Sequence, residues 1–591
     1  MAELDRGLEN VVEELARIPK YVCEATRERL RHLARLLLAA EAQGSTRLPL
    51  TRLGEQVPLE ELFSDPALEP FLGQVGEAKP FLKDGAWITT HRLFTAEQAF
   101  AERVDARASS TSRERILDGA LTQTPVRLSM EQIQAVQAAL DHPMTLISGN
   151  PGTGKTSIVV AILRALVRNQ VSPSRIALAA PTGKAAHRMR EAILRTLEKI
   201  QDRTPEEDQL AAEVQPRTLH RLLEWHPGQG LFRRHERRLL DCEILIVDEG
   251  SMVGLELADR LLRALPPTAQ LVILGDADQL PSVEAGAVFR DLLHVYPASA
   301  RYLTHSYRMD AGDPEGRNIL SVARAVNAGD GRQLWEGDEP ICARADLRDV
   351  QYRGVELLDT DEAGLSAFLE AWGQAQRQGF PGWSETLRRT WHQDAQGQWN
   401  PGESERLEAV FRHQERTRIL CPLKEAMGLR GTEPINQHLH TLARAQMGQG
   451  LRSDLDFYLG EPVMVHVNDY EHGLFNGDQG LVLLVRKEGG DPHQMAVFPR
   501  ERGFLAVPLD AIRIHLELAY ALTIHKCQGS EYERVALVLP LQDHPALSRE
   551  STYTALTRAR KGALILGSRE VLEASAGRGV TRFSRMDSQA R

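Results

Sequence analysis

Short apolar runs alternate with amphipathic segments over residues 130–328, and this alternation predicts a parallel β-sheet with helices beside it. Strands that are apolar along their whole length are typical of parallel sheets covered on both faces. The pattern resumes later in the chain, so we expect a second unit of the same α/β class. The expected strands are 144–149, 175–180, 242–249 and 270–276 in the first unit, and 416–423, 516–526 and 533–541 in the second.

The residues before the first unit follow a different pattern. Leu, Ala and Val recur at helical spacing over 21–43, and we expect a mostly helical N-terminal domain. Asp84-Gly85, inside the segment 80–104, predicts a hairpin followed by a helix. The expected order is an N-terminal domain (1–106), a polar linker (107–128), a first α/β unit (129–305) and a second α/β unit (306–591).

Apolar and polar residues alternate in strand fashion over 460–489, within the second unit. Asn476-Gly477-Asp478 is a hairpin signal there, so we expect a small inserted β-barrel over 458–515. The preceding stretch 329–415 has a weaker, mixed pattern and holds a group of tryptophans. They form either a local core or a partner surface, because exposed tryptophan is enriched at interfaces. These tryptophans are Trp372, Trp383, Trp391 and Trp399.

Composition narrows the class of protein. The chain has 591 residues, of which 42% are hydrophobic, and this is ordinary for a globular protein. No apolar run approaches the roughly 20 residues of a membrane helix, and the acidic N-terminus does not resemble a signal peptide. The five cysteines are far apart, which argues against a clustered metal site and favours a reducing cytoplasm. The net charge is -10, so a nucleic acid would need a local positive surface.

Residues 149–156 fit the phosphate-binding pattern G-x-x-x-x-G-K-[ST]. The pattern lies between an apolar run and the segment SIVVAILRALVR (157–168), as its strand–loop–helix context requires. The backbone N–H groups would surround the β-phosphate of ATP, Lys155 would reach the β- and γ-phosphates, and Thr156 would bind Mg²⁺. The candidate nucleotide-binding residues of this segment are Gly149, Asn150, Pro151, Gly152, Thr153, Gly154, Lys155, Thr156 and Ser157.

Polar residues with complementary chemistry end two further apolar runs. Asp248 and Glu249 follow Ile244–Val247, where Asp248 would hold Mg²⁺ and Glu249 would polarise the attacking water. Gln279 follows the next run and would lie near the γ-phosphate. Arg308 and Arg558 are candidates for arginine fingers, which stabilise charge on the transferred phosphoryl group.

The motifs, taken in order over roughly 128–562, resemble superfamily 1B DNA helicases and most closely the RecD family, which includes the alpha subunit of exonuclease V (RecBCD). The chain differs from the family motifs at Gly250, Cys527 and Asn150, and none of these differences removes a catalytic group. The matching segments are LSMEQ (128–132), LAAPTGKAAHRM (178–189), TLH (218–220), DEGSM (248–252), GDADQLPSVEAG (275–286), YRM (307–309), AYALTIHKCQGSEYERV (519–535) and YTALTRARKG (553–562).

The resemblance implies two RecA-like domains with ATP in the cleft between them, an SH3-like inserted barrel, and movement in the 5′→3′ direction along single-stranded DNA. It also implies that Gln132 reads adenine and that Gly529 and Glu531 belong to the nucleotide site. Family candidates for DNA contact are Thr182, Lys184, Thr218, His220, Thr523 and His525, with Asn476 and Phe475 as weaker ones. His525 is either a DNA contact or a packed core histidine.

The segment 223–241 occupies the place of the family's strand-separating hairpin. Its charged run 233–238 would meet duplex phosphates at a fork, or is simply a solvated face. We find no nuclease signature outside the helicase motifs, so any nuclease activity is expected in another subunit.

The resemblance leaves three hypotheses. About 125 residues precede the first motif, and segment 80–104 resembles the short domain that docks the alpha subunit on the gamma subunit (RecC), so we expect a heterotrimer with RecB-like and RecC-like subunits. The second hypothesis is a stand-alone repair helicase. The third is an ATP-gated DNA-binding scaffold without productive hydrolysis. The presence of Glu249, Gln279, Arg308 and Arg558 argues against it.

Overall fold

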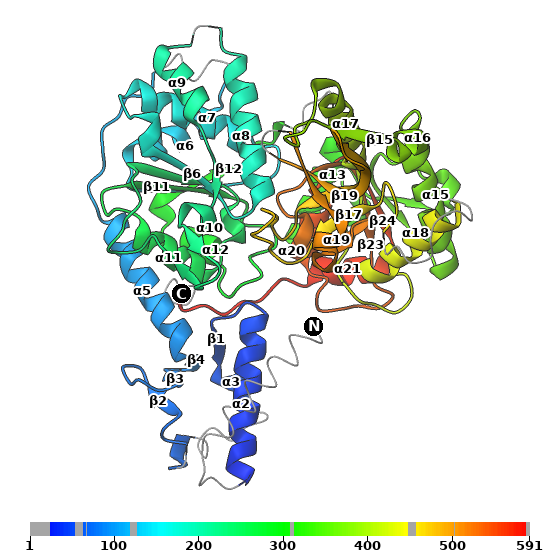
Figure 1. The fold of residues 1–591 in the computed structure, drawn as a ribbon. Coiled ribbons are helices and arrows are strands. Elements are labelled where there is room, and N and C mark those ends of the chain that lie inside the picture. The colour runs from blue at the N-terminus through cyan, green and yellow to red at the C-terminus, as the bar shows by residue number, and fades with distance from the viewer. Residues whose placement is uncertain are drawn as a thin grey trace.

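The protein has a mixed α/β fold with two parallel sheets, an antiparallel sheet and a small N-terminal sheet (Figure 1). Within the described part of the chain, no helix combines the length and the apolar character needed to cross a bilayer. The computed structural model describes residues 24–53, 63–66, 68–118, 127–201, 203–307, 313–446, 457–500 and 503–586.

The N-terminal part combines helices with a four-stranded sheet of order β1-β4-β3-β2. The hairpin expected at Asp84-Gly85 is confirmed, because Asp84 pairs with Trp87 and Gly85 has a φ of +58°. The elements are α2 (Glu24–Ala42), β1 (Arg47–Pro49), α3 (Leu50–Leu53), β2 (Leu72–Gln74), β3 (Phe81–Asp84), β4 (Trp87–Thr90) and α5 (His91–Ala108).

Helix α5 belongs by its packing to the first α/β unit. Phe100 and Val104 of α5 are buried in one core with Leu245, Leu261 and Phe289. The expected boundary near residue 106 therefore does not separate two cores, because the last helix of the N-terminal part buries its apolar face against the first unit.

The first α/β unit is a six-stranded sheet of order β12-β5-β11-β10-β6-β7, in which every pairing is parallel. All four strands expected in this unit are confirmed. The elements are α6 (Met130–Asp141), β5 (Met144–Gly149), α7 (Lys155–Arg168), η2 (Pro173–Arg175), β6 (Ile176–Ala180), α8 (Gly183–Glu198), α9 (Pro205–Glu213), β7 (Arg217–Thr218), α10 (Leu219–Leu222), β8 (Trp225–His226), β9 (Leu231–Phe232), β10 (Ile244–Val247), η3 (Gly250–Met252), α11 (Leu255–Ala264), β11 (Gln270–Gly275), α12 (Val288–Val295), η4 (Pro297–Ser299) and β12 (Ala300–Leu303).

The second α/β unit is also a parallel sheet, of order β13-β14-β24-β23-β16-β22. Its elements outside the inserted sheet are α13 (Pro314–Ala328), α14 (Gln333–Glu336), β13 (Cys342–Arg344), η6 (Leu347–Asp349), β14 (Gly354–Leu358), α15 (Glu362–Gln378), β16 (Thr417–Cys421), α18 (Thr432–Gln446), β22 (Ala521–Thr523), η8 (His525–Cys527), β23 (Tyr532–Val538), α20 (Arg549–Leu556), β24 (Ala559–Leu566) and α21 (Arg569–Gly577).

An antiparallel sheet of order β20-β19-β18-β17-β21 is inserted in the second unit, and β15 pairs with β18 in parallel. The hairpin expected at Asn476-Gly477-Asp478 is confirmed, because β17 and β18 pair antiparallel on either side of the loop 466–478. The Asp478 backbone N–H donates to the Phe475 carbonyl at 2.9 Å, which closes a turn at Asn476-Gly477. The elements are α16 (Trp383–Arg388), β15 (Thr390–Gln393), α17 (Pro401–Gln414), β17 (Pro462–Val465), β18 (Gln479–Lys487), β19 (Pro492–Pro499), β20 (Phe504–Pro508), α19 (Leu509–Ile512), η7 (Arg513–His515) and β21 (Leu516–Leu518).

The tryptophan-rich segment forms local cores. Trp383 and Trp391 are buried with Phe411, Leu483 and Val497, so they cover one face of the antiparallel sheet. Trp372 packs separately against the core beside α15 and α18, and Trp399 lies partly buried at the edge of the first cluster. Of the two readings of this segment, the structure supports a local core.

The C-terminal tail, residues 578–586, returns from the second unit to the N-terminal part (Figure 1). The backbone N–H of Thr46 donates to the carbonyl of Phe583 at 2.8 Å. The backbone N–H of Arg585 donates to the Glu97 carboxylate at 2.9 Å, and Arg582 Nη2 donates to the Ser282 carbonyl at 2.6 Å. The tail therefore connects the end of the second unit to the first unit and to the N-terminal part.

Candidate nucleotide and DNA site

Five of the motifs lie at one edge of the first sheet. The phosphate-binding loop follows β5, Thr182 follows β6, Asp248 follows β10, and residues 276–280 follow β11. Thr218 ends β7. Because all of these strands are parallel, their carboxyl ends share an edge, which is where open α/β sheets bind ligands.

The loop 149–156 has the backbone needed to surround a phosphate. Gly152 and Gly154 have φ values of +84° and +79°, which glycine adopts without strain. A Cβ on Gly154 would lie 2.4 Å from Nε2 of Gln132, so a larger residue there would displace the Gln132 amide. Lys155 is the first residue of α7. Its Nζ donates to the carbonyls of Gly149 and Asn150, so its side chain lies across the phosphate-binding loop.

The start of α7 supplies the remaining predicted groups. Thr156 and Ser157 lie in its first turn and are partly exposed, whereas Pro151 and Thr153, in the loop itself, are buried. The first N–H groups of a helix have no partner within the helix, so this terminus favours an anion. The residues present therefore fit a nucleotide phosphate.

Gln132, expected to read adenine, is bonded to the phosphate-binding loop. Its Nε2 donates to the Thr153 carbonyl at 2.9 Å. Its Oε1 accepts from the Tyr307 hydroxyl and from the Ser129 backbone N–H, both at 2.9 Å. The Tyr307 backbone N–H also donates to the Gly152 carbonyl at 2.9 Å. The amide of Gln132 is thus occupied by protein partners, and its contact with adenine stays a prediction.

The two carboxylates after β10 lie together. Oδ1 of Asp248 accepts from the Glu249 backbone N–H at 2.8 Å. Burial and the Glu249 charge raise the pKa of Asp248 to about 6, and Lys155 opposes the rise. Glu249 has a φ of +54°, a left-handed conformation that is costly for a residue with a Cβ and that is concentrated at functional sites.

The donor set fits Mg²⁺. Carboxylate and hydroxyl oxygens are the ligands that this cation prefers, and it commonly takes only one or two protein carboxylates beside substrate phosphates. The described residues include no cluster of three or more His, Cys, Asp or Glu side chains that could hold a metal unaided. A cation bound at Thr156 and Asp248 would therefore depend on the nucleotide phosphates as well.

Asp276 and Gln279 form a buried pair after β11. Gln279 Nε2 donates to Asp276 Oδ2 at 2.9 Å, and the Asp278 backbone N–H donates to Oδ1 at 3.1 Å. Burial raises the pKa of Asp276, and the Lys155 charge lowers it, so the pair lies within electrostatic reach of the phosphate-binding loop. Oε1 of Gln279 is buried and has no hydrogen-bond partner among the described residues.

Residues of the second unit bond to the loop 276–280. The Tyr553 hydroxyl donates to Asp276 Oδ2 at 3.1 Å. The Leu280 backbone N–H donates to Thr554 Oγ1 at 2.8 Å, and Gln528 Nε2 donates to the Leu280 carbonyl at 2.7 Å. These hydrogen bonds join the two units at the carboxyl edge of the first sheet.

Arg558 is buried next to this junction. Its Nε donates to the Thr554 carbonyl at 3.2 Å and its Nη1 to the Ser530 carbonyl at 3.1 Å. Its charge lowers the pKa of Tyr553, which burial raises more strongly. The Arg558 charge thus lowers the pKa of Tyr553, and the Lys155 charge lowers the pKa of its partner Asp276. Arg308 lies outside the described residues.

A second set of contacts between the units passes through Arg188 of α8. Its Nη1 donates to the Gly529 carbonyl at 2.8 Å and its Nη2 to the Glu531 carbonyl at 3.3 Å. The side chain of Glu531 pairs with Arg560 at 2.8 Å. The motifs did not single out Arg188, Tyr553 or Asp276, because their partners are distant in the sequence.

The DNA candidates of the first unit lie at helix starts. The hydroxyls of Thr182 and Thr218 accept from the N–H groups of Ala185 and Arg221, both at 3.2 Å, and each keeps an O–H to donate. Lys184 Nζ lies 3.5 Å from Glu415 of the second unit. His220 is exposed, and its ring packs against Phe232 with centroids 5.7 Å apart.

The candidates of the second unit lie at the end of β22, in η8 and in the loop 466–478. His525 is exposed, so it is not a packed core histidine, and Thr523 is half-buried. Asn476 is exposed, and its backbone N–H donates to Asn468 Oδ1 at 2.7 Å. The Arg221 guanidinium lies 4.6 Å from the centroid of the Phe475 ring. The loop 466–478 therefore touches the first unit beside Thr218 and His220.

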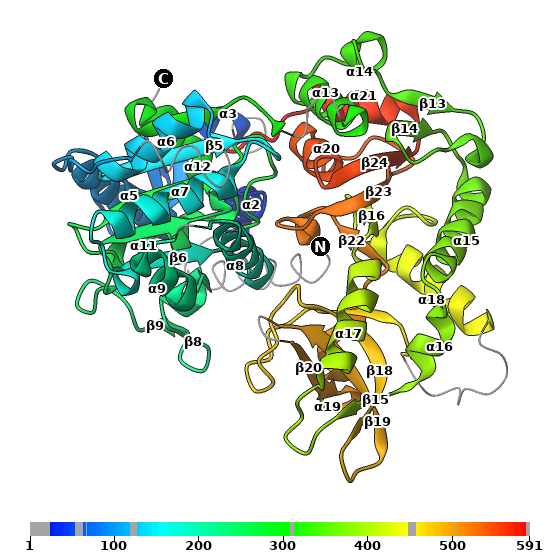
Figure 2. The same cartoon turned by 90° about the horizontal axis from the view of Figure 1, so that it is seen from above.

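The segment 223–241 forms a hairpin in which β8 and β9 pair antiparallel, and it projects from the first unit (Figure 2). Arg234 and Arg238 pair with Glu224 at 2.7 and 3.0 Å, so part of the charged run is neutralised within the hairpin. Arg233 and Arg237 are exposed. Both readings of the run, DNA contact and solvated face, stay open.

Comparison with known proteins identifies the family. A family model described as an AAA domain matches residues 132–285, and a UvrD-like helicase C-terminal domain matches residues 518–566. The RecBCD enzyme subunit RecD of Mycolicibacterium smegmatis is 30% identical over 574 residues, covering 93% of this chain and 91% of the relative. RecD of Mycobacterium tuberculosis is 34% identical over 469 residues, covering 77% of this chain and 72% of the relative.

This chain belongs to the RecD family. It is therefore a DNA helicase that uses a nucleotide. The ATP-dependent RecD2 DNA helicase of Deinococcus radiodurans is also 30% identical, over 76% of this chain and 50% of that relative. Among solved structures, the Pif1 helicase from Candida albicans is similar with a TM-score of 0.38 and 18% identity, covering 78% of this chain and 97% of Pif1.

Proposed function

We propose that this RecD-family helicase is the ATP-driven 5′→3′ motor subunit of a RecBCD-type complex that processes DNA double-strand breaks in the cytoplasm. The observation that supports it most is the junction between the two α/β units. The loop that carries Asp276 and Gln279 is hydrogen-bonded by Tyr553, Thr554 and Gln528 of the second unit. A nucleotide bound beside that loop would be sensed by both units.

We take residues 129–305 and 306–591 as two RecA-like domains. Helix α5 extends the first of them, and residues 458–515 form an SH3-like insertion in the second. ATP would lie at the carboxyl edge of the first sheet. The backbone N–H groups of the loop 149–156 and Lys155 would hold its phosphates, in place of the carbonyls that Lys155 contacts in this structure.

The chemical step is an in-line attack of water on the γ-phosphoryl group. Glu249 would accept the proton of that water, and Arg558, with Arg308, would stabilise the charge on the transferred group. Mg²⁺, held through Thr156 and Asp248, would neutralise phosphate charge. Gln132, Gly529 and Glu531 would complete the nucleotide site.

DNA would lie across both units. The candidates Thr182, Lys184, Thr218 and His220 lie on the first, and Asn476, Thr523 and His525 lie on the second. Closing and opening of the units during each ATP cycle would change the spacing between these two sets of contacts and move a single strand. The hairpin 223–241 would meet the fork.

The proposed partners follow from the relatives. The match to RecD of Mycolicibacterium smegmatis covers 93% of this chain, so it includes most of the N-terminal part as well as the motifs. We propose that residues 1–106 dock on a RecC-like subunit, with a RecB-like subunit completing a heterotrimer. Similarity to RecD2 of Deinococcus radiodurans favours a stand-alone helicase as the second candidate.

The test uses the full chain, alone and with co-expressed RecB- and RecC-like subunits. We expect ATP hydrolysis to be stimulated by oligo-dT, unwinding to require a 5′ tail, and Lys155→Gln to abolish both. Co-purification of the two subunits supports the complex, and robust unwinding by the isolated monomer supports the stand-alone helicase. Full DNA-stimulated hydrolysis by Lys155→Gln would refute the assignment of the site.

A further inference from the structure

Asp276, Gln279 and Tyr553 form a buried polar group that spans the two units. Asp276 is 1% exposed, Gln279 is 4% exposed and Tyr553 is fully buried. The Asp276 carboxylate accepts from the Tyr553 hydroxyl at 3.1 Å and from Gln279 Nε2 at 2.9 Å. Figure 2 shows α20, which carries Tyr553, on the side of the second unit that faces the first.

The carboxylate determines how the Gln279 amide is oriented. An ionised carboxylate only accepts hydrogen bonds, so Gln279 must present its NH₂ group to Asp276. Its Oε1 then points away from Asp276, buried and, over the ranges that the structure describes, without a hydrogen-bond partner. A buried acceptor without a donor is unfavourable, so this atom favours a donor that arrives with the substrate.

The chemistry of the substrates decides which donor that is. Phosphate oxygens at neutral pH are chiefly acceptors, and they cannot satisfy a carbonyl oxygen. The attacking water does have O–H groups to donate. In this orientation Gln279 Oε1 is therefore suited to bind that water, while its NH₂ group remains on Asp276.

Tyr553 is the only one of the three residues that comes from the second unit, and 277 positions separate it from Asp276. Burial and the Asp276 charge raise the pKa of Tyr553 well above its ordinary value, so the hydroxyl stays a donor. Its hydrogen bond forms only while the units are apposed, and separation removes one of the donors that hold the Asp276 carboxylate in place.

We infer that Tyr553 is a positioning residue for ATP hydrolysis, which acts through Asp276 to hold Gln279 Oε1 toward the attacking water only when the two units are closed. The inference rests on the proposed ATPase function. It assigns to the Tyr553–Asp276 hydrogen bond the task of making hydrolysis depend on closure. Tyr553 touches neither phosphate nor water in this assignment.

The first test is Tyr553→Phe in the full chain, which removes the hydroxyl and keeps the ring. We expect the DNA-stimulated kcat to fall about tenfold, which is the loss of about 1.4 kcal/mol expected for one hydrogen bond to a charged acceptor. The KM for ATP and the affinity for a fluorescent ATP analogue should stay within about twofold of wild type. A purely structural role would lower the amount of folded enzyme and leave kcat per bound nucleotide unchanged.

Tyr296→Phe is the matched control. Its hydroxyl donates to Asp105 at 2.6 Å, so the variant loses the same kind of hydrogen bond at the packing of α5 against the first unit. We expect wild-type kcat and KM from this variant. Asp276→Asn tests the same link from its other side, and we expect a loss of kcat similar to that of Tyr553→Phe.

The decisive measurement is a double-mutant cycle with Gln279→Ala. If Tyr553 acts through Gln279, then adding Tyr553→Phe to Gln279→Ala causes no further loss of kcat. Additive losses would overturn the inference, as would wild-type kcat in Tyr553→Phe. Absence of DNA-stimulated hydrolysis in the wild-type chain would refute the proposed function instead, which separates the two failures.

Discussion

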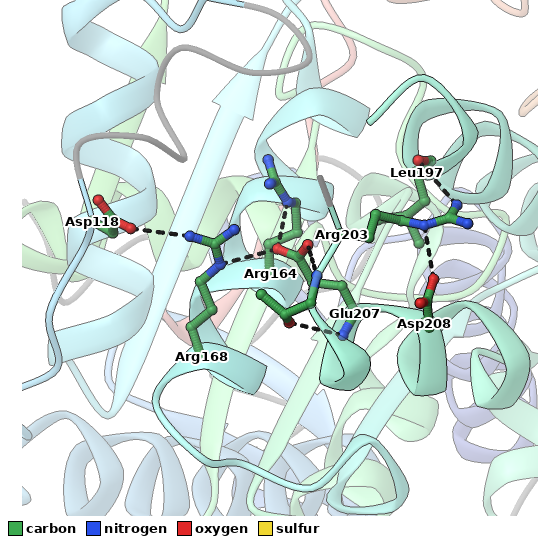
Figure 3. Close-up of polar contacts among 8 residues, drawn as sticks. Asp118, Arg164, Arg168, Leu197, Arg203, Glu207 and Asp208 are labelled. Atoms are coloured by element: carbon green, nitrogen blue, oxygen red, sulfur yellow. Dashed lines mark hydrogen bonds and ion pairs between the residues drawn. The ribbon is translucent and has the colours of Figure 1, made fainter. Parts of the chain in front are cut away.

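Glu207 of α9 carries a charge that is completely buried, and Glu207→Gln removes this charge with little change in volume. Its Oε1 accepts from Arg164 Nε at 2.9 Å and from Arg168 Nε at 3.1 Å, both on α7, the helix that begins with Lys155 (Figure 3). Its Oε2 accepts from the Thr204 backbone N–H at 3.1 Å and so caps α9. Arg168 also pairs with Asp118 at 3.0 Å.

The expected cost follows from burial. Arg164 is 2% exposed and Glu207 is 0% exposed, so the variant removes a counter-charge from a buried guanidinium. Removing one partner of a buried pair typically costs about 3–5 kcal/mol. Because glutamine keeps the cap on α9, we expect the lower end, about 3 kcal/mol. For a unit of this size that corresponds to a decrease in Tm of about 10 °C.

Asp208→Asn is the matched control in the same helical turn. Asp208 pairs with Arg203 at 2.8 Å, but its side chain is 58% exposed (Figure 3). Exposed pairs contribute under about 1 kcal/mol, so its Tm should change by only a few degrees. Thermal unfolding, with hydrogen exchange of α7 and α9 to locate the loss, measures both variants. Equal decreases in Tm would contradict the reasoning that burial determines the cost.

Three further predictions concern single residues. Burial raises the pKa of Glu97 to about 7 from an ordinary value near 4.5. The free energy of unfolding should therefore fall by about 3 kcal/mol as pH rises from 4.5 through 7. In Glu97→Gln, the melting temperature should depend less on pH over this window. Glu249→Gln should bind the ATP analogue normally but hydrolyse ATP at least about 100-fold more slowly; normal turnover would exclude its role as base. Lys184→Ala should weaken oligo-dT binding several-fold and reduce the salt slope by about 0.7, as fluorescence anisotropy across salt concentrations would show, and an unchanged slope would place the DNA elsewhere.

Local patterns were sufficient to predict the nucleotide loop and the main strands. The turns at Gly152 and Gly154 and the apolar runs that become β5, β10 and β11 depend on backbone freedom and on burial of consecutive side chains. Both are properties of a few neighbouring residues. Parallel pairing then follows, because helices separate the strands, and it brings their carboxyl ends to one edge.

Contacts between distant segments could not be predicted in this way. The Trp-rich segment became a local core because β15 pairs with β18, and the loop 466–478 places the Phe475 ring against Arg221 of the first unit. Each outcome depends on which distant surfaces pack together in the folded chain. The spacing of residues along the sequence does not indicate which surfaces these are.

The sequence by itself determined the chemical groups of this helicase, their order, and the sheet edge at which the first unit presents them. The tertiary structure decided which groups act together across the two units, including the hydroxyl of Tyr553 on Asp276. The physical reason is that a phosphate-binding loop is specified by the conformations of adjacent residues. A hydrogen bond across 277 positions exists only where two separately folded surfaces bury it.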